Sequence, residues 1–185
     1  MTREELLEVC RKAPTMGEVA LEDFVDYILV LPRTQQVGEE WVTVEGLYMA
    51  VDGKIAMANL DHRLAGKRLD FEPPMVLVDD EEQLTLMVTV TSEIYGRRHG
   101  IATSHKVGGS LIEQSNPWEV AETSAIGRAL AAMGYGLLPG ASLTSAEDVA
   151  PNPVAERGGE GRRAPASRRL RMRRGSVSEH QQRKL

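Results

Sequence analysis

Before residue 157, candidate phosphate-binding residues gather in two short segments near the middle of the chain. Lysine and arginine side chains neutralise phosphate groups, and an aromatic ring beside them can stack on an unpaired base. The candidate phosphate contacts are Arg63, Lys67 and Arg68 in the first segment and Arg97, Arg98, His99 and Lys106 in the second, where Tyr95 offers a stacking face. These residue types are suited to binding a single-stranded nucleic acid. An Arg-Arg pair in a turn bracketed by glycines is also typical of a solvated loop.

Acidic residues offer a different chemistry, that of a small metal-dependent nuclease. The candidate metal ligands are Asp61, Asp70, Asp79 and Glu93. The run 79–82 places four acids in a row between two apolar stretches, and successive side chains alternate between the two faces of a strand. A solvated turn therefore explains this run better than a metal site, and we predict no metal.

Other enzyme classes lack their sequence signatures. The chain contains no G-x-x-x-x-G-K-[ST] phosphate loop and no H-E-x-x-H motif. The histidines His62, His99, His105 and His180 have no ligand spacing, and the single cysteine, Cys10, cannot form an intramolecular disulfide. We therefore predict no catalytic residue and no cofactor.

The first half of the chain predicts short helices followed by strands. Thr2 and Glu5 match a capping box for a helix that ends at Pro14, and a short helical or mixed stretch covers 19–31. From Trp41 to Val51 the residues are typical of a strand. Asp52-Gly53 is a hairpin signal, so 55–60 is expected to return as a second strand.

The middle of the chain predicts the rest of an antiparallel sheet. Strands are expected at 75–78, 84–95 and 101–107, separated by turns at 79–82 and 96–100. The chain is therefore expected to be an α+β protein with four to five antiparallel strands.

The strongest predicted helix covers 117–133. Asn116 suits the N-cap, Pro117 the first helical position, and Gly134 the C-terminal end. The helix is rich in small residues, so we expect it to pack very close to a sheet or another helix. Arg128 has only small neighbours at i±3 and i±4, and it either pairs with a sheet carboxylate or faces a bound anion.

The net charge of −5 over 185 residues averages two unlike regions. Residues 157–185 carry ten basic and two acidic residues, a balance of +8, and 1–156 carry 12 and 25, a balance of −13. We predict one domain over 1–150 and a disordered Arg-rich tail over 151–185. The tail either solubilises the protein or makes non-specific phosphate contacts through Arg162, Arg163, Arg168, Arg169, Arg171, Arg173 and Arg174.

The sequence also bears on the compartment. The N-terminal segment MTREELLEVC has no basic region followed by an apolar one, and apolar runs such as Ile28–Leu31 are only a few residues long. A membrane span needs about 20 apolar residues. We expect a soluble, cytoplasmic protein that contacts no membrane.

One segment is similar to a known motif. NPWEVAETSAIGRALAAMGYG, from Asn116 to Gly136, resembles the A-E-T-S-A-[IVW]-G-R-A-[LI] helix of phage and prophage proteins grouped with the Erf-like, Rad-type single-strand annealing recombinases. The segments VDGKIA (51–56) and LDH (60–62) lie in the upstream region, and the resemblance covers about 40–140.

The resemblance implies a β-β-β-α core that assembles into a homo-oligomeric ring or filament. It also implies single-stranded DNA binding and annealing without nucleotide hydrolysis, in phage-type recombination and repair within an infected or prophage-bearing bacterium. A phage exonuclease or a host single-strand-binding protein would be further partners. The resemblance implies a basic groove, whereas 1–156 are acidic overall, so a local stripe must supply the charge. A metal-dependent nuclease and a protein-interaction module with an acidic surface are the alternatives.

Overall fold

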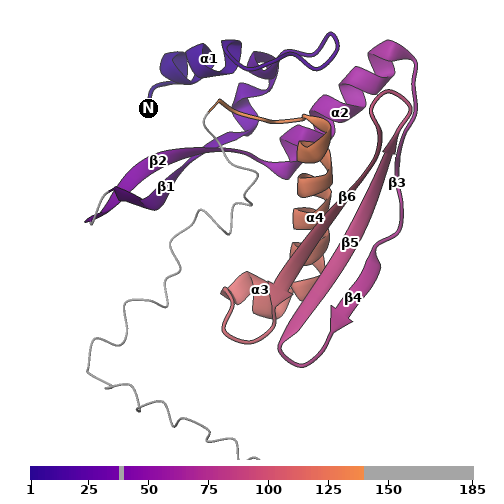
Figure 1. Cartoon of the computed structure of the whole chain (residues 1–185). Coiled ribbons are helices and arrows are strands. Elements are labelled where there is room, and N and C mark those ends of the chain that lie inside the picture. Colours follow the sequence, from indigo (N-terminus) through magenta and orange to yellow (C-terminus); the bar gives the residue numbers. More distant parts are fainter. Residues whose placement is uncertain (38–39, 140–185) are drawn as a thin grey trace, which may run out of the picture. The chain divides into compact units, whose positions relative to one another are not determined.

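The computed structural model describes residues 1–37 and 40–139, except the side chains of 33–37 (Figure 1). The predicted tail, with the seven arginines predicted to contact phosphates, lies outside the described residues. In chain order the elements are α1 (Arg3–Arg11), the 3-10 helix η1 (Leu21–Tyr27), β1 (Ile28–Val37), β2 (Glu40–Met49), α2 (Val51–Ala65), β3 (Leu69–Phe71), β4 (Met75–Asp79), β5 (Gln83–Ser92), β6 (Gly96–His105), α3 (Leu111–Ser115) and α4 (Pro117–Met133). The protein is an α+β fold with antiparallel sheets.

The first helix forms as its capping box predicts. The Thr2 side chain accepts from the Glu5 backbone N–H, and the Glu5 carboxylate accepts from the Thr2 N–H at 2.7 Å. Leu6 and Cys10 are buried on one face of α1, so the helix contributes to the core.

The prediction of a strand at 55–60 is wrong, because α2 covers these residues. Strand β2 pairs instead with β1, from Ile28 opposite Met49 to Val37 opposite Glu40. Asp52-Gly53 is the first turn of α2, where a Cβ on Gly53 would lie 2.4 Å from Met49 Sδ. The close approach of α2 to the base of the hairpin therefore requires this glycine, and tertiary packing overrides the local turn signal.

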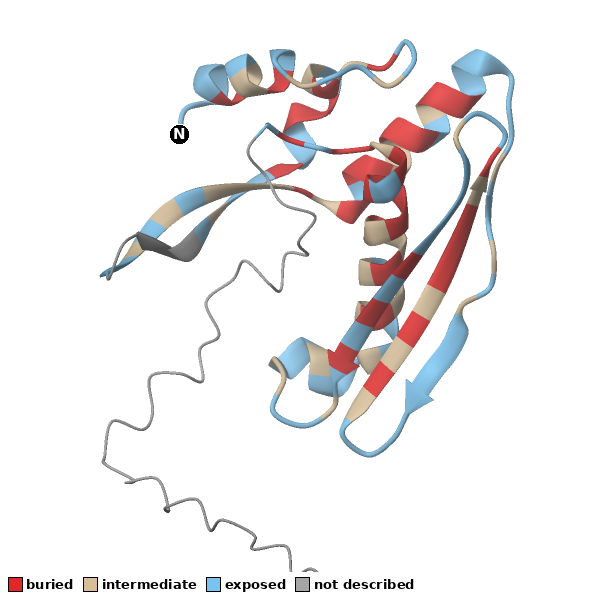
Figure 2. Ribbon diagram, viewed as in Figure 1, coloured by how far each residue is buried: buried red, intermediate tan, exposed pale blue. Residues whose placement is uncertain are grey.

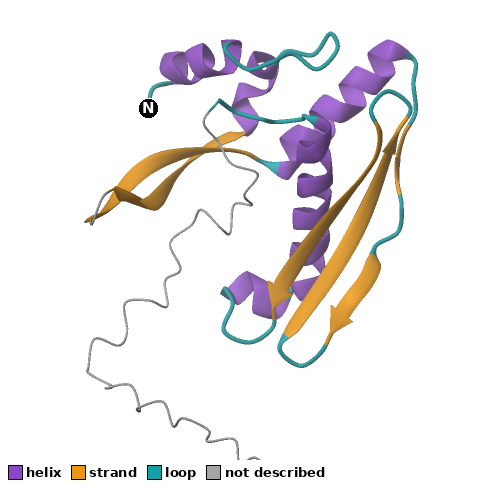
Figure 3. Ribbon diagram, viewed as in Figure 1, coloured by secondary structure: helices purple, strands orange, loops and turns teal. Residues whose placement is uncertain are grey.

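The central sheet is built around β5 (Figure 3). Strands β3 and β4 pair with one edge of β5, and β6 pairs with the other from Gln83–His105 to Ser92–Gly96. The predicted turn at 96–100 is wrong, because β6 begins at Gly96 and the turn is 93–95. Gly96 has a φ of +76° directly after that turn. Arg97 and Arg98 therefore lie on a strand.

Helix α4 packs on one face of this sheet, where it covers the buried residues of β5 and β6 (Figure 2). Its buried face consists mostly of small residues, of which Ala121, Ala125 and Ala129 are fully buried, together with Leu130 and Met133. A Cβ on Gly127 would lie 2.7 Å from Val51 Cγ2, so α4 also approaches α2 closely. The prediction of a tightly packed small-residue helix is confirmed.

The ends of α4 follow the sequence with one difference. Pro117 occupies the first turn, and Gly134 ends the helix with a φ of +116°. Asn116 stands at the N-cap, but its side chain makes no capping hydrogen bond; Nδ2 lies 3.5 Å from Ser115 Oγ. Among the helices of the described residues, none is long and apolar enough to cross a membrane.

Candidate nucleic-acid interface

The first predicted basic segment and the start of the second, about 30 residues apart in sequence, lie at the same end of the central sheet. The end of α2 leads into β3, where Leu69 pairs with Ser92 at the β5–β6 turn. The Arg68 N–H donates to Glu93 Oε2 at 2.9 Å, and the Glu93 N–H donates to Arg68 O at 3.1 Å. We call this surface the cationic end; its members are Arg63, Lys67, Arg68, Arg97 and Arg98.

Carboxylates share the cationic end. Arg97 Nη2 lies 2.8 Å from Glu72 Oε2, and Arg68 Nη2 lies 3.5 Å from Asp70 Oδ2. These side chains are exposed, and exposed ion pairs are worth only about 0–1 kcal/mol. Arg63 and Lys67 are exposed and form no ion pair with any described residue. The cations can therefore exchange their present partners for phosphates at low cost.

Lys106 lies at the other end of β6. Its Nζ contacts Asp79 Oδ1 and donates to Asp80 O at 2.6 Å. A ten-residue strand is about 30 Å long, so Lys106 is separated from the cationic end by nearly the length of the sheet. We call residues 79–82, the last residue of β4 and the turn that follows it, the acidic turn. Here the backbone N–H groups of Gln83 and Glu82 hold the pKa of Asp80 below its usual value.

Arg128 reaches from α4 to the sheet. Its Nη1 donates to the carbonyl oxygen of Ile101 on β6 at 2.7 Å. Arg98 makes a similar contact with the same strand, because its Nη1 donates to Arg97 O at 2.8 Å. Two guanidinium groups are thus held along β6 by its backbone.

A buried polar cluster lies behind the cationic end, and the sequence did not predict it. Asp61 is only 3% exposed, and its Oδ2 accepts hydrogen bonds from Tyr135 Oη at 2.7 Å and Tyr95 Oη at 2.9 Å. Burial, reinforced by the Asp61 carboxylate, raises the pKa of both tyrosines. Tyr135 lies 74 residues after Asp61, so only the folded topology brings the two together.

His62 and Ser92 complete this cluster. Ser92 Oγ accepts from the backbone N–H groups of Ile94 at 3.0 Å and Tyr95 at 2.9 Å, so its proton points to His62 Nε2, 2.7 Å away. His62 Nδ1 donates to Ala58 O at 2.7 Å. The β5–β6 turn, which precedes the two arginines of β6, is therefore fixed to α2 by a continuous chain of hydrogen bonds.

The ring of Tyr95 belongs to this cluster. It is half-buried and packs edge-on against Tyr135, with centroids 5.8 Å apart, and against His62 at 6.2 Å. Its hydroxyl is bound to Asp61. Tyr95 therefore offers a base much less free ring surface than the sequence suggested.

Lys54 is buried inside the described part of the fold. It is 7% exposed, with Nζ 3.5 Å from Gly127 O and 5.2 Å from the centroid of the Tyr48 ring. Burial lowers its pKa to about 8. It lies where α2 meets α4, inside the fold, and so is not a surface phosphate contact.

The four carboxylates considered for a nuclease lie in three places. Asp61 is in the buried cluster, Asp70 and Glu93 are at the cationic end, and Asp79 contacts Lys106. Over residues 1–37 and 40–139, no group of three or more His, Cys, Asp or Glu side chains is placed to hold a metal ion.

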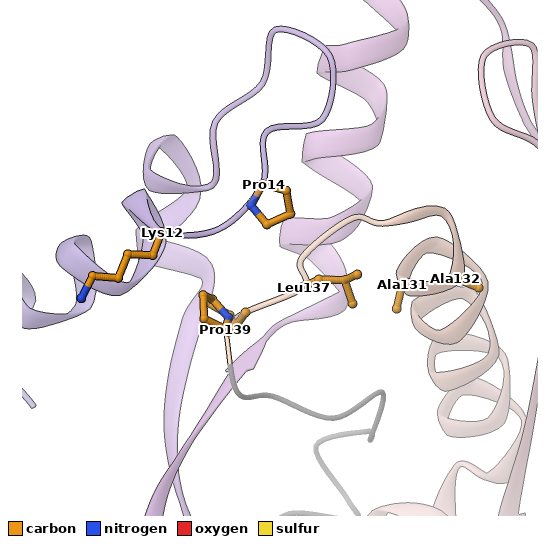
Figure 4. Close-up of a pocket in the computed structure, with 7 residues that line it drawn as sticks. Lys12, Pro14, Ala131, Ala132, Leu137 and Pro139 are labelled. Atoms are coloured by element: carbon orange, nitrogen blue, oxygen red, sulfur yellow. The ribbon is translucent and has the colours of Figure 1, made fainter.

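An apolar pocket of about 670 Å³ lies between the end of α1 and the end of α4 (Figure 4). Its lining comes from Lys12, Pro14, Ala131, Ala132, Leu137, Leu138 and Pro139. None of the predicted contact residues lines it.

Comparison with known proteins leaves the family open. No protein-family model matches the chain, and no curated protein gives a significant match. The function must therefore be inferred from the residues and their geometry.

Proposed function

We propose that this protein binds single-stranded DNA through the cationic end. The observation that carries the proposal is the convergence of the first basic segment with Arg97 and Arg98 of the second, where Arg68 and Glu93 are joined by two hydrogen bonds. Groups that neutralise a flexible phosphate chain must lie near one another, and these five residues share one end of the sheet, where Arg97 and Arg98 point to opposite faces of β6.

The acidic total of the domain is compatible with this proposal. The cationic end holds five basic side chains against the carboxylates of Asp70, Glu72 and Glu93. The other residues up to 156 include seven basic and 22 acidic ones. A polyanion is therefore attracted to one surface and repelled by much of the rest, which confines binding to the cationic end.

We further propose that the bound strands are annealed without nucleotide hydrolysis by a homo-oligomeric assembly, with no catalytic residue. The support is the AETSAIGRAL segment of α4 and the order β4, β5, β6, α3, α4, which matches the β-β-β-α order that the resemblance implies except for the short inserted helix α3. In this proposal the arginines of the tail add non-specific affinity, and an exonuclease or a host single-strand-binding protein would be a further partner.

Salt-dependent binding of a labelled single-stranded oligonucleotide to the full chain tests the DNA proposal. Lys67→Gln should weaken binding at low salt and reduce the slope of log K against log salt by about 0.7. Lys12→Gln is the matched control, because Lys12 is also an exposed lysine that forms no ion pair with a described residue. Equal losses in the two variants, or no binding by the wild type, would exclude this site.

Two further measurements separate the remaining alternatives. The protein should accelerate the pairing of complementary labelled strands in the absence of ATP, and its mass in solution should exceed that of one chain.

Magnesium-dependent cleavage of the oligonucleotide that is lost in Asp79→Ala would favour the nuclease instead. Binding abolished only by replacing the tail arginines would mean that the tail, and not the domain, holds the DNA.

A further inference from the structure

One face of the central sheet is left uncovered by the described helices. Gly100 and Ala102 of β6 face α4, and side chains alternate along a strand, so Arg97, His99 and Ile101 point to the opposite face. On the same face Ile101 pairs with Met87 of β5, which pairs with Met75 of β4. Met75 and Ile101 stay 56% and 48% exposed.

A neighbouring side chain fixes His99 on this face. Its Nδ1 lies 2.9 Å from Thr89 Oγ1, and Thr89 is only 5% exposed although no described helix covers it. His99 itself is exposed. It therefore presents an oriented aromatic ring, whereas the ring of Tyr95 is engaged in the buried cluster.

The uncovered face begins at the cationic end. Arg97 is two residues before His99 on β6 and carries one of the five positive charges. From Arg97 to Ile101 the strand advances about 13 Å. A phosphate chain held at the cationic end would thus place its bases over His99 and then over the Met87–Ile101 row, before the acidic turn at the far end of the sheet.

We propose that this face is a stacking platform for the bases of the single-stranded DNA, with His99 as the stacking residue. The inference rests on the proposed function and adds base recognition to it. Unpaired bases stack on exposed rings and lie on apolar side chains, and both are present here next to phosphate-binding charges. Duplex DNA hides its base faces, so the platform favours single strands over duplexes.

The test compares two histidines of the same strand and face. His105 pairs with Gln83 at the far end of β6, where it is exposed. The probes are a labelled oligothymidylate and an abasic oligonucleotide of equal length, which has the same phosphates and no bases. His99→Ala in the full chain should weaken oligothymidylate binding about fivefold or more. His105→Ala should leave it within about twofold, and neither variant should change abasic binding.

A second variant guards against loss of folding. His99→Phe retains a ring but cannot bond to Thr89, so it should bind oligothymidylate about as well as the wild type. Equal affinity of the wild type for the two oligonucleotides, or unchanged binding in His99→Ala while Lys67→Gln is weakened, would overturn the platform and leave the cationic end in place. Failure of the wild type to bind either oligonucleotide would overturn the proposed function itself.

Discussion

Gly100 of β6 lies directly against Ala125 of α4, so that a Cβ on the glycine would be 1.9 Å from the Ala125 carbonyl oxygen. The same Cβ would lie 2.7 Å from the Ala129 backbone nitrogen. Both obstacles are backbone atoms of a regular helix, so neither can rotate away. The separation of helix and sheet is thus set by the absence of a side chain at this position.

Gly100→Ala should therefore destabilise the fold severely. The helix must move off the sheet, and we expect the free energy of unfolding to fall by about 2–4 kcal/mol in chemical denaturation. Thr123→Ala, at an exposed position on α4, is the control and should stay within about 0.5 kcal/mol. A Gly100→Ala variant as stable as the control would contradict the close contact.

The buried Lys54 should give stability a distinctive pH dependence. Its pKa is about 8 in the fold and near its ordinary value of 10.5 in the unfolded chain. The unfolded chain therefore binds more protons between these values, and stability rises with pH across this window. Below pH 8 the full cost of this pKa shift is present, about 3 kcal/mol.

Lys54→Met isolates this contribution. The variant should be more stable than the wild type at pH 7, and the rise between pH 8 and 10 should disappear from urea denaturation curves. Above pH 10 stability should fall in both proteins, because the raised pKa values of Tyr95 and Tyr135 favour the fold only while the unfolded tyrosines keep their protons. If the unfolding free energy of the wild type did not change between pH 8 and 10, Lys54 would not be a buried lysine that loses its proton in this range.

Tyr95→Phe should loosen the β5–β6 turn. The change removes one donor to Asp61 and should cost about 1–3 kcal/mol. Tyr135→Phe removes the other donor at similar cost, but Tyr135 is not in the turn. Amide exchange at Ile94 and Tyr95 should therefore accelerate more in the first variant. Equal acceleration in both variants would mean that the cluster acts only through global stability.

Glu72→Gln should strengthen DNA binding. Glu72 Oε2 holds Arg97 at 2.8 Å, and phosphates must compete with that carboxylate. Its removal frees a cation, so affinity should rise several-fold, with a salt slope steeper by about 0.7. Glu119→Gln, an equal change of charge at an exposed position on α4, controls for net charge. Equal gains in DNA affinity in the two variants would show that the ion pair between Glu72 and Arg97 does not compete with phosphate binding.

The local features of the fold were predictable, and the long-range ones were not. The capping box of α1, the strands near 75–79 and 83–92, and the small-residue helix α4 follow from nearby residues. Helix α2 was missed because Asp52-Gly53 imitates a turn, while the reason for Gly53 is contact with Met49 and Tyr27.

The candidate site was predictable in its residue types and not in its arrangement. The two basic segments were identified, but their meeting depends on the pairing of β3 with β5. Lys106 was grouped with Arg97 by proximity in sequence, and an extended strand separates them. No nearby residues indicate the contact between Asp61 and Tyr135. His99 replaced Tyr95 as the candidate stacking residue only because the structure shows that the Tyr95 hydroxyl is bound to Asp61 while His99 is exposed beside Thr89.

The cationic end and the acidic turn stand at opposite ends of β5, about 30 Å apart. This separation gives the sheet an electric dipole along its own strands. The field of a nearby polyanion orients such a dipole, so the protein turns its cationic end toward the DNA before the two make contact. Added salt should consequently lower the association rate more than it raises the dissociation rate, because the orienting field acts before the protein contacts any base.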